Sequence, residues 1–186
     1  MDKQLVTKKL QAKALNTQLV KLQQELEVVQ KASGIDSYIA VKIEKNQSRF
    51  ERTRVEDGAD IATGLYFLGI EVTAKQEAVY IPLSIASGKK TAGFMYQIEG
   101  TGEGSVFRAS VTSRGEGVSQ VTVGTIVYTK IPTGKTAMFR IQAELKGKIG
   151  KTYKLIIYRL NYKLKLTDAR YLQYVKELHS DSQKFS

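Results

Sequence analysis

The sequence predicts a mainly β protein, an antiparallel β-sandwich or jelly roll, with a long coiled-coil-type helix before it and a short helix after it. Three observations carry this prediction: apolar residues recur every seven positions near the amino terminus, alternate with polar residues through the middle, and return to helical spacing near the end. The expected segments are a helical arm (1–33), a β-sandwich domain (35–166), a C-terminal helix (167–179) and a flexible tail (180–186).

The predicted arm rests on composition and on a heptad seam. Residues 3–32 contain no Gly or Pro and are rich in good helix formers. Lys8 is the single interruption of the seam. The seam residues, which we expect to join subunits into a homo-oligomer, are Leu5, Ala12, Leu15, Leu19, Leu22, Leu26 and Val29. The alternative is an amphipathic helix packed on its own β domain, but a helix of about 30 residues would span roughly 45 Å, more than a small domain needs.

From Ile35 the hydrophobic period changes to two, which is typical of strands. Strands are expected at 38–43, 65–74, 78–86, 93–98, 106–111, 118–131, 137–145 and 153–166. The highly charged stretch 44–60 follows the first of them, and its acidic end is expected to be a solvated loop in preference to a calcium site. Turns rich in glycine separate the strands with no helix between them, which favours an antiparallel sandwich or jelly roll.

The end of the domain is predicted to be helical. Thr167 and Asp168 resemble a helix cap, and Ala169 to Leu178 carries apolar residues at helical spacing. The polar residues after Ser180 are expected to form a frayed tail.

The sequence offers little catalytic chemistry. It has no cysteine and one histidine, His179, so thiolate metal sites and cysteine nucleophiles are excluded and a histidine-based triad or zinc site is disfavoured. The segment from Gly134 to Thr136 lacks the earlier glycine of a phosphate-binding loop, and Gly100 to Gly104 fails the dinucleotide fingerprint. Both segments are interpreted as β connections. We expect no enzyme activity, cofactor or metal.

The chain carries a formal net charge of +11, and its basic residues concentrate between Lys130 and Lys165, where Glu144 is the only acid. If 137–145 and 153–166 pair as a hairpin, their basic side chains form an anion-binding patch. The patch residues are Arg140, Lys146, Lys148, Lys151, Lys154, Arg159 and Lys163. We expect them to bind an anionic polymer, either a cell-envelope polymer or nucleic acid, with affinity that falls as salt rises. The alternatives are an acidic surface of a neighbouring subunit and protection of sheet edges from aggregation.

The segment from Ile131 to Leu145 resembles a turn-and-strand pattern of immunoglobulin-like sandwich domains in bacterial surface proteins. Leu68–Ala74 and Tyr153–Tyr162 resemble flanking strands of such domains. The resemblance covers about residues 65–165 and implies a cell-surface or filament-forming role. The basic charge and the predicted arm also allow a viral or phage coat protein with a jelly-roll head.

These observations predict a non-enzymatic structural protein that associates through its arm and presents a basic β head, as a surface filament or adhesive module. No window approaches the roughly 18 apolar residues of a membrane span. The amino terminus lacks the apolar stretch of a secretory signal. The expected location is the cell surface if a leader was removed, and otherwise the cytoplasm or a virion.

Overall fold

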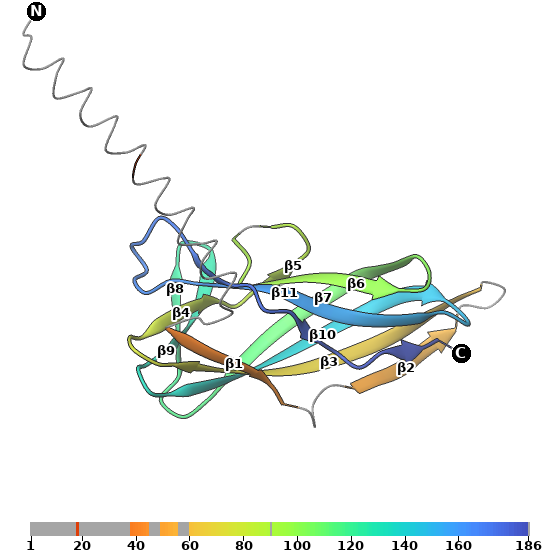
Figure 1. Cartoon of the computed structure of the whole chain (residues 1–186), viewed down its shortest axis with the longest axis horizontal. Helices are drawn as coiled ribbons and strands as arrows, with labels where there is room; N and C mark the ends of the chain where they lie inside the picture. Colours follow the sequence, from red (N-terminus) through yellow and green to blue (C-terminus); the bar gives the residue numbers. More distant parts are fainter. Residues whose placement is uncertain (1–17, 19–37, 45–48, 56–59, 90, 186) are drawn as a thin grey trace, which may run out of the picture. The chain divides into compact units, whose positions relative to one another are not determined.

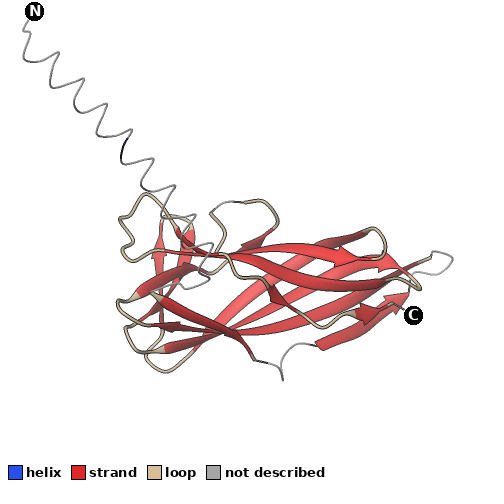
Figure 2. Cartoon of the chain, viewed as in Figure 1, coloured by secondary structure: helices blue, strands red, loops and turns tan. Residues whose placement is uncertain are grey.

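The computed structural model describes residues 18, 38–44, 49–55, 60–89 and 91–185, with the backbone alone for 49–55. The chain divides into two compact units, Met1–Asp36 and Ser37–Ser186. Every secondary-structure element of the described residues is a strand (Figure 2). The prediction of a mainly β protein is confirmed, whereas the fold class was wrong in its helices. The heptad seam, from Leu5 to Val29, lies outside the described residues, and nothing in the structure supports a coiled coil.

The described residues form strands numbered in chain order, and Figure 1 labels β1 to β11. They are β1 (Ile39–Ile43), β2 (Arg49–Val55), β3 (Ile61–Ala74), β4 (Val79–Pro82), β5 (Ile85–Ala86), β6 (Phe94–Gly100), β7 (Gly104–Arg114), β8 (Ser119–Val123), β9 (Ile126–Ile131), β10 (Thr136–Lys148), β11 (Thr152–Tyr162), β12 (Leu172–Tyr174), β13 (Leu178–His179) and β14 (Gln183–Lys184).

Three sheets are built from these strands. A five-stranded sheet has the order β1-β3-β10-β7, with β2 also paired to β3. A six-stranded sheet has the order β12-β11-β6-β5, with β13 and β14 also paired to β11, and a three-stranded sheet has the order β4-β9-β8. All pairs are antiparallel except β5 with β6, which is parallel.

The two larger sheets pack face to face through an apolar core. Along β10 the inward positions, from Ala137 to Leu145, are buried at every second residue, as a half-buried strand requires. The ring of Phe139 on β10 lies 5.0 Å from that of Phe94 on β6. The hydroxyl of Tyr66 on β3 donates a 2.7 Å hydrogen bond to the carbonyl of Tyr153 on β11. These contacts join the two layers, and the arrangement is consistent with a β-sandwich.

The predicted C-terminal helix is wrong. Residues 172–184 form the three short strands β12, β13 and β14, which run antiparallel along one edge of β11. The predicted frayed tail is also wrong for the described residues, because Phe185 is 1% exposed and packs on the ring of Tyr153 at 4.9 Å. The turn at Thr167 and Asp168 is closed by a 3.0 Å hydrogen bond from the Lys165 amide to the Asp168 carboxylate.

Two further segments differ from the prediction. The charged stretch 44–60 contains an unpredicted strand, β2, which pairs with β3. The predicted strand 118–131 is instead the hairpin of β8 and β9. Its turn is at Gly124, whose φ of 60° is a left-handed conformation that glycine adopts without steric cost.

Candidate anion-binding face

The outer surface of β7 and β10 gathers cationic side chains. We call this surface the basic face and define it by five outward residues: Arg108, Arg114, Arg140, Lys146 and Lys148. Alternation places these side chains opposite the core, since the intervening residues of β10 are buried. One acid, Glu144, shares the outer side of these two strands.

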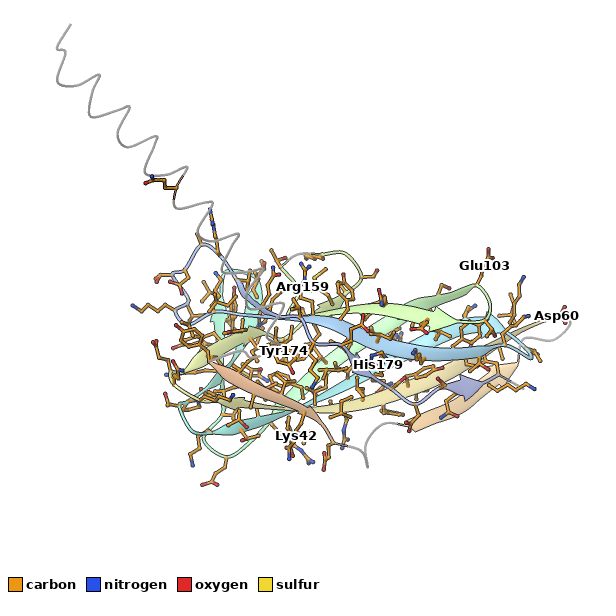
Figure 3. The ribbon with its side chains drawn as sticks, in the orientation of Figure 1. Lys42, Asp60, Glu103, Arg159, Tyr174 and His179 are labelled. Carbon is orange, nitrogen blue, oxygen red and sulfur yellow. The ribbon has the colours of Figure 1, made fainter. Side chains whose placement is uncertain are left out.

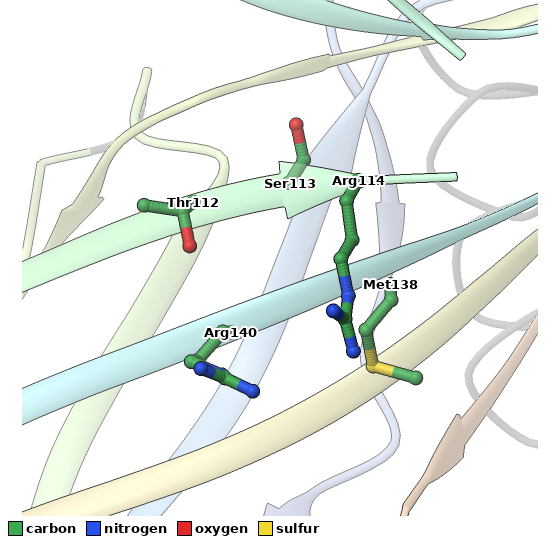
Figure 4. Close-up of a pocket in the computed structure, with 5 residues that line it drawn as sticks. All are labelled: Thr112, Ser113, Arg114, Met138 and Arg140. Atoms are coloured by element: carbon green, nitrogen blue, oxygen red, sulfur yellow. The ribbon is translucent and has the colours of Figure 1, made fainter. Parts of the chain in front are cut away.

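Two arginines of the basic face line a shallow pocket with a volume of about 200 Å³ (Figure 4). Arg114 lies opposite Met138, and Arg140 lies opposite Thr112, so the two guanidinium groups project from diagonal positions of the ladder. Within the described residues neither guanidinium forms an ion pair. Two like charges without a carboxylate beside them repel each other, and an oxyanion placed there would reduce this repulsion.

Other cations near the pocket are already neutralised. Arg108 lies 3.7 Å from Glu144, and Lys42 of β1 lies 2.5 Å from Glu71 of β3. Both pairs are partly exposed, so each contributes little to stability, but each engages a carboxylate on the outer side of the sheet.

At the carboxyl end of β10, exposed apolar side chains lie near cationic side chains. We define the lysine end as Lys146, Lys148 and Lys151 together with the exposed side chains of Ile61, Phe107 and Ile149. The relative exposures of these apolar residues are 36%, 51% and 37%. Lys148 lies directly opposite Ile61 in the ladder, and the Ile149 amide donates a 2.9 Å hydrogen bond to the carbonyl of Asp60. Asp60 and Glu103 lie at the same end of the sheets (Figure 3).

A β-bulge accounts for the exposure of Phe107. The pairing of β7 with β10 shifts by one residue between Glu144 and Leu145, so that Phe107 is the extra residue of β7. Bulges commonly redirect a side chain. Here the phenyl ring is exposed, and the Lys146 ammonium lies 5.6 Å from its centre, within the range of a cation–π contact.

Tyr153 fixes the backbone of the lysine end from beneath. Its side chain is fully buried, and its hydroxyl donates to the Glu103 carbonyl at 3.0 Å and accepts from the Lys148 amide at 2.8 Å. Because one phenol joins the β6–β7 turn to the end of β10, the positions of Lys146 and Lys148 are set by packing and not by a free loop.

Four glycines make room for the Tyr153 ring. A Cβ at Gly147 would approach ring atoms to 2.5 Å, one at Gly100 to 2.6 Å and one at Gly104 to 2.9 Å, all closer than real contacts allow. A Cβ at Gly102 would lie 3.0 Å from the phenol oxygen. The segment Gly100–Gly104, interpreted from sequence as a β connection, therefore also serves a packing role. The glycines at every second position of this segment were the sequence signal that could have indicated the packing role.

The structure divides the predicted patch. The expected hairpin is wrong, because β10 and β11 lie in different sheets. Arg140, Lys146 and Lys148 share the basic face, and Lys151 follows in the β10–β11 turn.

The three patch residues of β11 and its end have other surroundings. Lys154 pairs with Glu99 at 3.1 Å, and Arg159 stacks over Tyr158 at 5.9 Å. Lys163 is 9% exposed, donates to the Asp168 carbonyl and lies 4.8 Å from the ring centre of Tyr171. These residues do not extend the basic face.

His179 and Tyr171 are titratable side chains outside the basic face. His179 is exposed and lies 3.3 Å from its neighbour Glu177. Burial and a 2.9 Å hydrogen bond to Tyr128 raise the pKa of Tyr171 well above its usual value, so it is a neutral structural phenol. No group of three or more acidic, histidine or cysteine side chains that could hold a metal occurs in the described part of the chain. No helix among the same residues has the length and apolarity to cross a membrane.

Comparison with family models, with curated proteins and with solved structures finds no match to this chain. The basic face and the lysine end are therefore the features from which a function can be argued.

Proposed function

We propose that the protein is a non-enzymatic structural or adhesive module whose basic face binds an extended anionic polymer. The observation that carries this proposal is the concentration of five cationic side chains against one carboxylate on the outer side of β7 and β10. An immunoglobulin-like domain of a bacterial surface or filament protein, which the sequence resembles between about residues 65 and 165, would suit this role.

The geometry favours a polymer over a small ligand. Arg140 and Lys148 are eight residues apart on one strand, which corresponds to roughly 27 Å at about 3.4 Å per residue. A surface of this length with a shallow pocket at one end can contact several charged units of a chain, whereas it cannot enclose a small molecule.

The position of β10 argues against edge protection as the reason for these cations. Lysines are common on edge strands because they prevent association with other sheets. In this protein β10 is flanked by β3 and β7 within the same sheet. The outward charges of β10 therefore guard no edge, whereas Arg108 and Arg114 lie on β7, the last strand in the order of that sheet, where edge protection can account for them.

The test is retention on a sulfated polysaccharide, heparin, at several salt concentrations. The variant Arg140→Gln/Lys146→Gln/Lys148→Gln removes three charges from the basic face. The matched control, Lys89→Gln/Lys165→Gln/Lys176→Gln, removes three exposed charges elsewhere. We expect the slope of log affinity against log salt to fall by about 2 to 3 in the first variant, because roughly one counterion is released per contact. An equal loss in the control would show that net charge alone drives binding and would refute the proposal.

A second candidate function is binding of single-stranded nucleic acid, and the exposed ring of Phe107 beside Lys146 favours it. Bases stack on aromatic rings next to cations, and each stack contributes about 1–3 kcal/mol. In the same assay we expect Phe107→Ala to weaken binding of single-stranded DNA by roughly 5-fold to 150-fold while leaving heparin affinity within about twofold. If Phe107→Ala lowers the affinity of the protein for DNA and for heparin to the same degree, or lowers neither affinity, base stacking is not the role of Phe107.

A further inference from the structure

One edge of β11 is covered by the carboxyl-terminal end of the chain alone. We call residues 172–185 the strap. Its three strands, β12, β13 and β14, pair with β11 and with no other strand among the described residues, while β6 holds the opposite edge of β11. The strap follows β11 through the connection 163–171, and no other ladder among the described strands includes it.

The strap is an interrupted strand with two register shifts. From Tyr174 to Leu178 the strap advances four residues, while its partners on β11, Leu160 to Ile157, advance three. The same excess of one residue recurs between β13 and β14. From His179 to Gln183 the strap advances four residues, while its partners on β11, Ile156 to Tyr153, advance three. Each shift leaves residues outside the ladder, and no piece of the strap is longer than three residues.

Three apolar side chains anchor the strap in the core. They are the buried side chains of Tyr174, Leu178 and Phe185. Between them the Ser180 hydroxyl accepts a 2.9 Å hydrogen bond from the Leu155 amide, and the Ser180 amide donates to the Leu155 carbonyl at 2.9 Å. The spacing of these anchors is four and seven residues, which a regular strand of period two would not match at all three positions.

We propose that the strap exchanges between copies, so that the strap of one chain occupies the β11 edge of a second chain. The occupant is a second copy because the two register shifts and the three anchors fit the edge that this sequence provides. This inference is independent of the basic face and goes beyond the proposed polymer binding.

The energetics permit the exchange. An exchanged strap makes the same contacts in the partner that it makes in its own chain, so the difference in free energy is mainly the cost of association. Short interrupted ladders open at a lower cost than a whole domain. Exchange becomes favourable as the protein concentration approaches the effective concentration of the tethered strap, on the order of millimolar. Reciprocal exchange gives a closed dimer, and one-way exchange gives a linear chain.

The experiment uses two single-cysteine variants, Thr152→Cys and Lys184→Cys, in a protein that has no cysteine of its own. These positions face each other in the ladder of β11 and β14. The Phe185 amide donates to the Lys151 carbonyl at 2.9 Å, so the neighbouring Thr152–Lys184 pair lies at a close, non-hydrogen-bonded position that a disulfide can span. Mixed and oxidised, the two cysteines are held in disulfide geometry when the strap of one chain lies on the β11 of another, and a control mixture measures the yield from random collisions.

We expect a covalent dimer of one chain of each kind that accumulates with time and with concentration. The control mixture, Lys184→Cys with Gln120→Cys on β8, should give at most a few per cent of that yield, since β8 pairs only with β9 among the described strands. Equal yields from the two mixtures would overturn the proposal.

A double variant, Thr152→Cys/Lys184→Cys, keeps the test decisive. Its internal disulfide locks the strap in place, and we expect the locked chain to lose the dimers that the unmodified chain forms after incubation at high concentration, as measured by light scattering. If the locked chain dimerises as readily as the unmodified chain, association uses another surface and strap exchange is wrong.

Discussion

At the scale of single residues, Tyr66 links the stability of the molecule to pH. It is 1% exposed, and its hydroxyl donates to the carbonyl of Tyr153 in the opposite sheet. Burial, with a smaller contribution from the nearby Tyr153, raises the pKa of Tyr66 well above its usual value near 10. In the folded state Tyr66 therefore stays neutral at a pH where the unfolded chain loses this proton.

This shift predicts a loss of stability in alkali. Because the folded pKa is raised, its contribution is fully present below about pH 10, the unfolded value, and decreases as pH rises above it. We expect the free energy of unfolding of the native protein to fall between about pH 10 and 11.5 more steeply than that of Tyr66→Phe, by up to about 1.4 kcal/mol per pH unit. Denaturant titrations of both proteins at each pH measure this free energy of unfolding. Parallel slopes for the two proteins would contradict the assignment.

At the scale of elements, the glycines around Tyr153 show how composition serves packing. Gly147 belongs to β10 and Gly100 to β6, positions where glycine is normally unfavourable in a strand. Each lies against the Tyr153 ring, so the cost of a weak strand residue is offset by space for a buried phenol with two hydrogen bonds.

Gly147→Ala should therefore destabilise the protein by about 1–3 kcal/mol through overpacking against Tyr153. The physical cause can be tested with a double-mutant cycle. In the background of Tyr153→Ala, where the ring is absent, the added methyl group should cost much less, so the two effects should not add. Denaturant unfolding of the four proteins gives the coupling. Additive effects would mean that Gly147 is needed for its backbone and not for the ring.

The strap explains why a strand was mistaken for a helix. Tyr174 and Leu178 are both buried and lie four residues apart, a spacing that a strand of period two and a helix share. In short strands this shared spacing is easily interpreted as helical, and periodicity alone cannot distinguish the two. The pairing partner β11 decides the outcome, and it is not encoded within the strap.

At the scale of the whole molecule, alternation predicts strands but not the sheet to which each belongs. The alternation of β10 from Ala137 to Leu145 was interpreted correctly, and with it the outward Arg140, whereas Lys146 and Lys148 were expected beyond the strand and lie on it. In β11 a register shift between Ile157 and Arg159 breaks the alternation, and Asn161 is buried. A strand buried on one face shows the same pattern whether its neighbour in sequence pairs beside it or stacks across the core. The turn at Gly150, with a φ of 81°, carries the chain between the two layers.

The bulge at Phe107 depends on the register of β7 with a distant strand, β10. The same register places Arg114 and Arg140 in one pocket, and no local sequence pattern specifies it.

The contact between Phe185 and Tyr153 has a consequence for regulation. The strap ends on the same phenol that holds the Lys148 amide and the Glu103 carbonyl. If the shared ring couples the two events, the coupling is reciprocal. If a seated strap improves polymer affinity at the lysine end, bound polymer must favour the seated strap by the same factor. We expect heparin to slow formation of the disulfide between the Thr152→Cys and Lys184→Cys chains, and Tyr153→Phe to weaken that effect. Bound polymer would then inhibit strap exchange, and with it assembly, by an allosteric route.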